Sequence, residues 1–184
     1  MTNLTDNQRR WAKTLLIIYP RSKKIIEALQ ESRMKMATQG FSHYGTEALY
    51  DKISAVNYRM QGIVNLCVLT RDTLKALGIL HGEVLTLRHF KGRDMPDLAE
   101  YFETSVRNVY RRYDRALELF YSRLSAAGFG EEWLEREFGD DNLVKGIFLR
   151  SDGKIFSDKK AKKRRSERAK PRAAHWQKPS EDIA

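Results

Sequence analysis

Apolar side chains recur at helical spacing over most of the first 126 residues of the chain. Residues 6–18 place Trp11, Leu15 and Ile18 on one face, which predicts a first helix. Pro20 ends it, because proline lacks an amide hydrogen and its ring clashes with the preceding turn. Proline also suits the first turn of a helix, so a second helix is predicted up to Gly40, with an apolar face formed by Ile25, Ile26 and Leu29.

The longest periodic stretch lies between residues 47 and 77, where the spacing alternates between four and three residues. This heptad seam consists of Leu49, Ile53, Val56, Met60, Ile63, Cys67, Thr70, Leu74 and Leu77. Gly78 is well placed as the C-cap of the helix. Two interpretations stay open: the helix packs on the first two helices of its own chain, or it forms a dimerising coiled coil. The e and g positions that flank the seam show no pattern of complementary charges that would decide between the two interpretations.

Three helices joined by short turns are predicted next, at residues 83–90, 96–102 and 106–124. Pro96 suits a helix start, and Ser105 is a typical N-cap residue whose hydroxyl accepts a hydrogen bond from the next turn. This order of elements is typical of a helix-turn-helix, whose last helix enters the major groove of DNA.

The last of these helices has two faces of different chemistry. One face is expected to be buried and carries Val109, Tyr113, Ala116 and Leu117. The other face carries Arg107, Asn108, Arg111, Arg112 and Arg115. Arginine and asparagine bind bidentately to the edges of guanine and adenine, so this face is the predicted DNA contact. The preceding helix is acidic, with Asp97, Glu100 and Glu103, and would suit a basic partner protein better than phosphate.

The same segment resembles region four of bacterial sigma factors, which reads promoter DNA through a helix-turn-helix. The residues that carry this resemblance are Leu87-Arg88, Leu98-Ala99-Glu100, Ser105, Val109 and Ala116-Leu117. Residues 105–117 are more similar still to the ArpU-type, phage-associated transcription regulators, and Tyr19-Pro20 matches their helical N-terminal extension. The resemblance implies that Ser105, Arg107, Asn108, Arg111 and Arg112 lie at the DNA.

Two positions depart from the sigma pattern. Glu103 stands where glycine is usual, and positive φ is unfavourable for other residues, so the turn is expected to differ in geometry. Arg112 stands at a position that is often apolar, with Tyr113 taking the core role, so the helix is expected to be slightly rotated. Nothing in the chain resembles the promoter-melting region of sigma factors, which argues against a complete sigma factor.

The remaining segments are shorter and more polar. Residues 131–138 predict a short helix, while residues 144–149 and 154–156 flank an Asp-Gly turn and predict a small β-hairpin. Apolar content collapses from residue 157 onward, which predicts disorder. The predicted fold is therefore mostly α, with a helical N-terminal bundle or coiled coil (1–78), a helix-turn-helix (79–127), a helix and hairpin (128–156) and a disordered basic tail (157–184).

The formal charge of +10 is unevenly distributed. Residues 1–149 hold 22 basic and 19 acidic residues, whereas residues 150–184 hold 12 basic and 5 acidic residues. The run at 159–165 looks like a nuclear import signal, but beside a bacterial-type motif a phosphate-binding arm without sequence preference is the better interpretation.

The sequence offers no candidate chemistry for an enzyme. We find no Gly-rich phosphate loop and no nucleophile with a matching base, and we expect no cofactor. One cysteine and four scattered histidines have no metal-ligand spacing, so no metal site is expected. The apolar run at residues 15–19 is too short for a signal peptide or a membrane span.

These observations predict a sequence-specific DNA-binding transcription regulator, with a cytoplasmic, nucleoid-associated place in a bacterium. Its partners would be double-stranded DNA, a second copy through residues 47–77, and RNA polymerase. If the chain dimerises there, its operator should hold two half-sites about 10 bp apart or a multiple of that. The alternatives are a phage DNA-packaging recognition subunit of the small-terminase type and an adaptor that binds RNA polymerase through the acidic helix.

Overall fold

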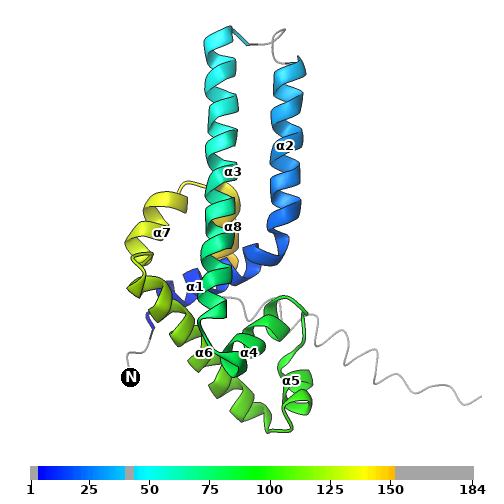
Figure 1. The fold of residues 1–184 in the computed structure, drawn as a ribbon, viewed down its shortest axis with the longest axis vertical. Helices are drawn as coiled ribbons and strands as arrows, with labels where there is room; N and C mark the ends of the chain where they lie inside the picture. The colour runs from blue at the N-terminus through cyan, green and yellow to red at the C-terminus, as the bar shows by residue number, and fades with distance from the viewer. Residues whose placement is uncertain (1–3, 40–43, 152–184) are drawn as a thin grey trace, which may run out of the picture. The chain divides into compact units, whose positions relative to one another are not determined.

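The computed structural model describes residues 4–39 and 44–151, and every regular element in these ranges is helical (Figure 1). The predicted mostly-α fold is confirmed for this part of the chain. The elements in chain order are α1 (Asp6–Ile18), the short 3₁₀ helix η1 (Tyr19–Arg21), α2 (Ser22–Gln39), α3 (Thr46–Lys75), α4 (Ile79–His89), α5 (Met95–Tyr101), α6 (Val106–Ala126), α7 (Glu131–Phe138) and α8 (Asn142–Ser151).

Helix α1 lies at the centre of the hydrophobic core. Thr5 caps its start, and the Gln8 side chain accepts a hydrogen bond from the backbone N–H of Thr5 in return. The helix contacts α3, α4, α6, α7 and α8, and Leu15, Leu16 and Ile18 are completely buried. A helix this short is marginal alone, so burial among its neighbours is what stabilises it.

Helices α2 and α3 form a hairpin, which Figure 1 shows as the two long helices running side by side. Of the two open interpretations of the heptad seam, the structure shows packing within the chain, because α3 packs against α2 and α1 and seam residues Leu49, Ile63 and Thr70 are buried. Gly78 is not the C-cap that the sequence predicted. Helix α3 ends earlier, with Ala76 as its C-cap, and Gly78 adopts a φ of 76° as the N-cap of α4.

Helices α4, α5 and α6 follow the predicted order and lie at the C-terminal end of α3 (Figure 1). The α5 start is capped by Asp94, whose carboxylate accepts a hydrogen bond from the N–H of Asp97 at 2.9 Å. The α6 start is capped by Ser105, whose hydroxyl accepts from the N–H of Asn108 at 3.3 Å, as its position in the sequence predicted.

The predicted β-hairpin is wrong at its first strand, because residues 144–149 belong to helix α8. The Asp141 carboxylate caps this helix by accepting hydrogen bonds from the N–H groups of Leu143 and Val144, at 2.9 and 3.1 Å. The helix then packs on α1, with the ring centres of Phe148 and Trp11 4.7 Å apart. The second predicted strand (154–156) and the predicted disordered tail (157–184) lie outside the described residues.

Candidate nucleic-acid interface

The buried face of α6 fixes the orientation of the helix. Val109, Ala116 and Phe120 are completely buried, and the helix packs against α4, α5 and α1. Tyr113 takes the predicted core position: its hydroxyl shares a 3.0 Å hydrogen bond with Nε2 of His89, and the two rings are stacked. Burial lowers the pKa of His89 to about 3, so this contact is made by a neutral imidazole. The opposite face of α6 therefore cannot turn inward.

The predicted site residues divide into two groups on this opposite face. Arg107 and Arg111 are exposed and make no hydrogen bond or ion pair with any described residue. Arg112 is half-buried, with its guanidinium 5.8 Å from the centre of the Phe102 ring, and Arg115 donates a 3.0 Å hydrogen bond to Glu118. Two of the four predicted arginines are thus free for a partner, and two already have contacts in their own chain.

Asn108 is exposed but held in place by the turn before α6. Its Nδ2 atom donates a hydrogen bond to Oγ1 of Thr104 at 3.2 Å. That bond uses one of the two amide hydrogens, which leaves the second hydrogen and the carbonyl oxygen available. The amide is therefore oriented before any partner arrives.

The turn between α5 and α6 contradicts the expectation for Glu103. This residue adopts the left-handed conformation, with a φ of 48°, which its side chain was expected to avoid. The N–H of Thr104 donates to the carbonyl of Ala99 at 2.9 Å and that of Glu103 to Glu100 at 3.2 Å, which is the hydrogen-bond pattern of a Schellman motif. These bonds close the turn as a glycine would, at a conformational cost of about 1 kcal/mol.

Sequence reasoning missed three side chains around this face. Val106 and Tyr110 are apolar yet 40% and 52% exposed, and their place outside the buried seam was the signal that could have found them. Arg9 of α1 reaches α6 and forms a 2.9 Å ion pair with Asp114. This pair offsets an acidic group beside the arginines, and no local pattern could have predicted it across 105 residues of sequence.

The acidic helix α5 is partly balanced by a basic residue. Arg93, Asp97, Glu100 and Tyr101 line a shallow hollow, and the Arg93 guanidinium lies 4.9 Å from the centre of the Tyr101 ring. The Tyr101 hydroxyl donates a 2.7 Å hydrogen bond to Glu83 on α4. This hydrogen bond to the Glu83 carboxylate raises the pKa of Tyr101, so its hydroxyl stays protonated.

The described part of the chain contains no cluster of three or more His, Cys, Asp or Glu side chains that could hold a metal ion. Within the same residues, no helix combines the length and the apolar character needed to cross a membrane. Comparison of the chain with protein-family models, curated proteins and solved structures gives no match.

Proposed function

We propose that this chain is a sequence-specific DNA-binding transcription regulator. In this proposal α5, the turn at residues 102–105 and α6 act as a helix-turn-helix, and α6 enters the major groove of double-stranded DNA. The observation that carries the proposal is the pair of exposed arginines, Arg107 and Arg111, which have no partner in the described chain. They lie in the first two turns of a helix whose opposite face is anchored in the core.

Each exposed group of α6 suits a different contact. Arg107 and Arg111 are proposed to bind guanine O6 and N7, and Asn108 to bind adenine through its carbonyl oxygen and its remaining amide hydrogen. Val106 offers an apolar surface to a thymine methyl group. Arg112 and Arg115, which already have contacts in the chain, suit phosphates better than bases. The start of the helix at Ser105 is proposed to lie against the phosphate backbone of the DNA.

Residues 157–184 are proposed to add affinity without sequence choice. Their charge comes mainly from lysine and arginine runs, which release counterions from any DNA they contact. The free energy of this contribution should fall steeply with salt, whereas base contacts of α6 should set which sequence is bound.

The proposal is tested by gel-shift titration on a preferred DNA site and on scrambled DNA. Arg107→Ala and Arg111→Ala should each weaken binding to the site by about 10- to 100-fold and leave binding to scrambled DNA nearly unchanged. Arg123→Ala is the matched control, because Arg123 is exposed near the other end of the same helix. Truncation at Ser157 should weaken binding to the preferred site and to scrambled DNA by the same factor. Equal loss of preference in the arginine variants and the truncation would overturn this division of roles.

A second candidate, an adaptor for RNA polymerase, is favoured by the acidic hollow on α5. Asp97 and Glu100 lie there beside Tyr101, which suits a basic partner surface. A pull-down of polymerase by a chain with no DNA affinity at low salt would favour the adaptor. A ring of eight or more copies in light scattering would instead favour a phage DNA-packaging subunit.

A further inference from the structure

Exposed apolar side chains gather on one side of α3, and this side differs from the heptad seam. The seam is already buried against the chain itself, as Leu49 and Ile63 show with exposures of 3% and 1%. Tyr50, Val64 and Val68 lie on the other side and are 71%, 41% and 42% exposed. A coiled coil through the heptad seam would have to displace α2, so any partner of this helix must meet its free side.

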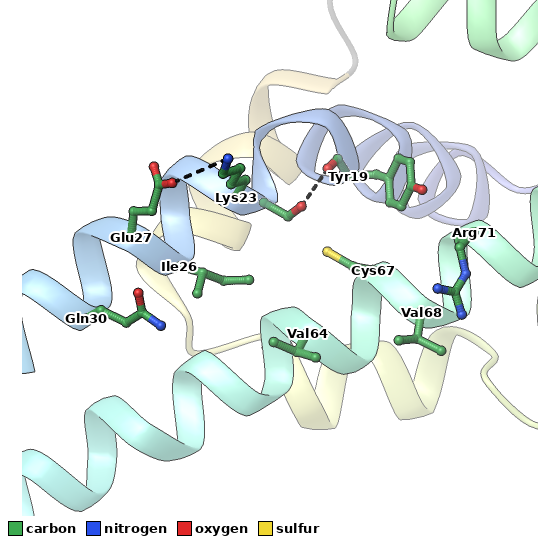
Figure 2. Close-up of a pocket in the computed structure, with 10 residues that line it drawn as sticks. Tyr19, Lys23, Ile26, Glu27, Gln30, Val64, Cys67, Val68 and Arg71 are labelled. Atoms are coloured by element: carbon green, nitrogen blue, oxygen red, sulfur yellow. Dashed lines mark hydrogen bonds and ion pairs between the residues drawn. The ribbon is translucent and has the colours of Figure 1, made fainter.

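A groove of about 480 Å³ opens between α2 and the C-terminal half of α3. Figure 2 shows Val64 and Val68 on the α3 wall, Ile26 on the α2 wall and Cys67 between the two helices. Arg71 lies at one end of the groove and is exposed to solvent. Its Nε atom donates a 2.9 Å hydrogen bond to Asp72, and its other guanidinium nitrogens bind no described residue. The α2 wall also carries the exposed ion pair of Lys23 and Glu27. The groove thus sets a few apolar side chains beside the Arg71 guanidinium, which suits an aromatic side chain next to a carboxylate.

The free side of α3 carries both of those groups at its other end. Glu47 and Tyr50 lie in the first two turns and are exposed, and Glu47 makes no hydrogen bond or ion pair with a described residue. Positions 47, 50, 54, 57, 61, 64, 68 and 71 repeat at spacings of three and four, so they form one continuous stripe that runs beside α2. In the middle of this stripe, the Asn57 side chain accepts a 3.1 Å hydrogen bond from Arg33 of α2 and stays exposed. The stripe begins with an acid and an exposed aromatic and ends with the groove and a cation.

We propose that the groove is occupied by the α3 helix of a second copy of this chain, in antiparallel orientation. In an antiparallel pair, Tyr50 can lie opposite the partner's Val68. The same register brings Glu47 opposite the partner's Arg71, because Glu47 precedes Tyr50 by three residues and Arg71 follows Val68 by three. The two-fold axis repeats both contacts, so each subunit supplies one tyrosine and fills one groove. Charge complementarity identifies the occupant: an antiparallel copy pairs opposite charges, whereas a parallel copy would place Glu47 against the partner's Glu47. The proposal is independent of DNA binding.

Sedimentation equilibrium of the full chain tests the proposal by measuring the dimer dissociation constant. Val68→Asp should weaken the dimer more than about 100-fold, because it places an unpaired charge in an apolar contact. Glu47→Lys and Arg71→Glu should each weaken it about tenfold, since each leaves two like charges facing one another. The double variant should restore the affinity to within about threefold of the wild type. Circular dichroism checks that every variant folds, which is expected for exposed positions.

Cysteine cross-linking tests the orientation in a Cys67→Ser background. A mixture of Glu47→Cys and Arg71→Cys chains should form the mixed disulfide under mild oxidation, and neither variant alone should form a covalent dimer. A monomer over about a hundredfold range of concentration would overturn the proposal. Covalent dimers of Glu47→Cys alone, or a double variant as weak as the single ones, would overturn it equally.

Discussion

Helices α3 and α6 are both long, both amphipathic, and both bury a seam of regularly spaced residues in the same core, yet their exposed faces differ. The free side of α3 mixes one carboxylate, one tyrosine, one serine, two amides, two valines and one arginine. The exposed face of α6 instead concentrates arginine in its first three turns, where Arg107 and Arg111 pair with none of the described residues. The buried seams therefore explain the fold of both helices, while only the exposed groups distinguish what each helix can bind.

The two helices also differ in how their buried sides are anchored. Helix α3 uses a charged pair, in which Arg59 binds both carboxylate oxygens of Asp141, the residue that caps α8. Helix α6 uses a neutral contact between Tyr113 and His89. The two anchors should therefore respond differently to mutation and to pH.

The largest expected effect comes from the α3 anchor. Burial raises the pKa of Asp141, but the Arg59 guanidinium and two backbone N–H donors lower it by more, so the net pKa falls below the usual value. Asp141→Ala removes both the ion pair and the helix cap, and should lower the free energy of unfolding by about 2–3 kcal/mol. Denaturant titration measures this loss. Glu31→Ala, which removes an exposed ion pair with Lys35 on α2, is the control and should leave the midpoint unchanged.

The α6 anchor should make stability depend on pH below neutrality. The pKa of His89 is about 3 in the folded chain against a usual value of 6.5, so between these values the unfolded chain binds a proton that the folded chain does not. The free energy of unfolding should then fall by about 1.4 kcal/mol per pH unit, or about 2 kcal/mol between pH 6.5 and pH 5. His89→Gln keeps a partner for Tyr113 without this titration. An equal loss of stability in wild type and variant over this range would contradict the buried neutral imidazole.

The entry to α6 should gain stability from one substitution. Glu103→Gly removes the side chain that disfavours the left-handed conformation, and should raise the free energy of unfolding by about 0.5–1 kcal/mol. Thermal unfolding measures the gain, and Glu100→Gly, in the helical part of α5, should lower stability instead. If both variants lose stability, Glu103 does not hold a positive φ in solution.

The smallest expected effect on DNA binding concerns the apolar contact proposed for Val106. Its truncation to alanine removes two methyl groups from the exposed face of α6 and should weaken binding to a preferred site by about threefold to tenfold. Replacing thymine by uracil in that site should weaken binding of the wild type by a similar factor. The same replacement should leave binding of the variant almost unchanged. Independent, additive losses from the two changes would show that Val106 does not contact the methyl group.

Much of α6 could be predicted from the sequence, because its signals are local. Ser105 caps the start, the buried seam sets the face, and the observed helix runs from Val106 to Ala126. Helix α8 could not be predicted in this way. The Asp152-Gly153 pair indicated a turn, whereas the helix depends on Asp141 as a cap and on packing against Trp11, far away in the sequence.

The candidate site shows the same limit. The sequence supplied the residue types on the exposed face of α6, but it could not separate free from engaged side chains. That distinction depends on contacts between helices, such as Arg112 on Phe102 and the ion pair of Arg9 with Asp114. The groove beside Val68 is likewise formed by two helices and has no signal in either helix alone.

The most direct test of the central claim, that the arginines on α6 choose the DNA sequence, is selection of bound DNA from a random pool. The full chain should enrich one shared motif, and Arg123→Ala should enrich the same motif. The double variant Arg107→Ala, Arg111→Ala should enrich no motif or a different one, while still binding DNA at low salt. Enrichment of an unchanged motif by the double variant, or of no motif by the wild type, would contradict the claim.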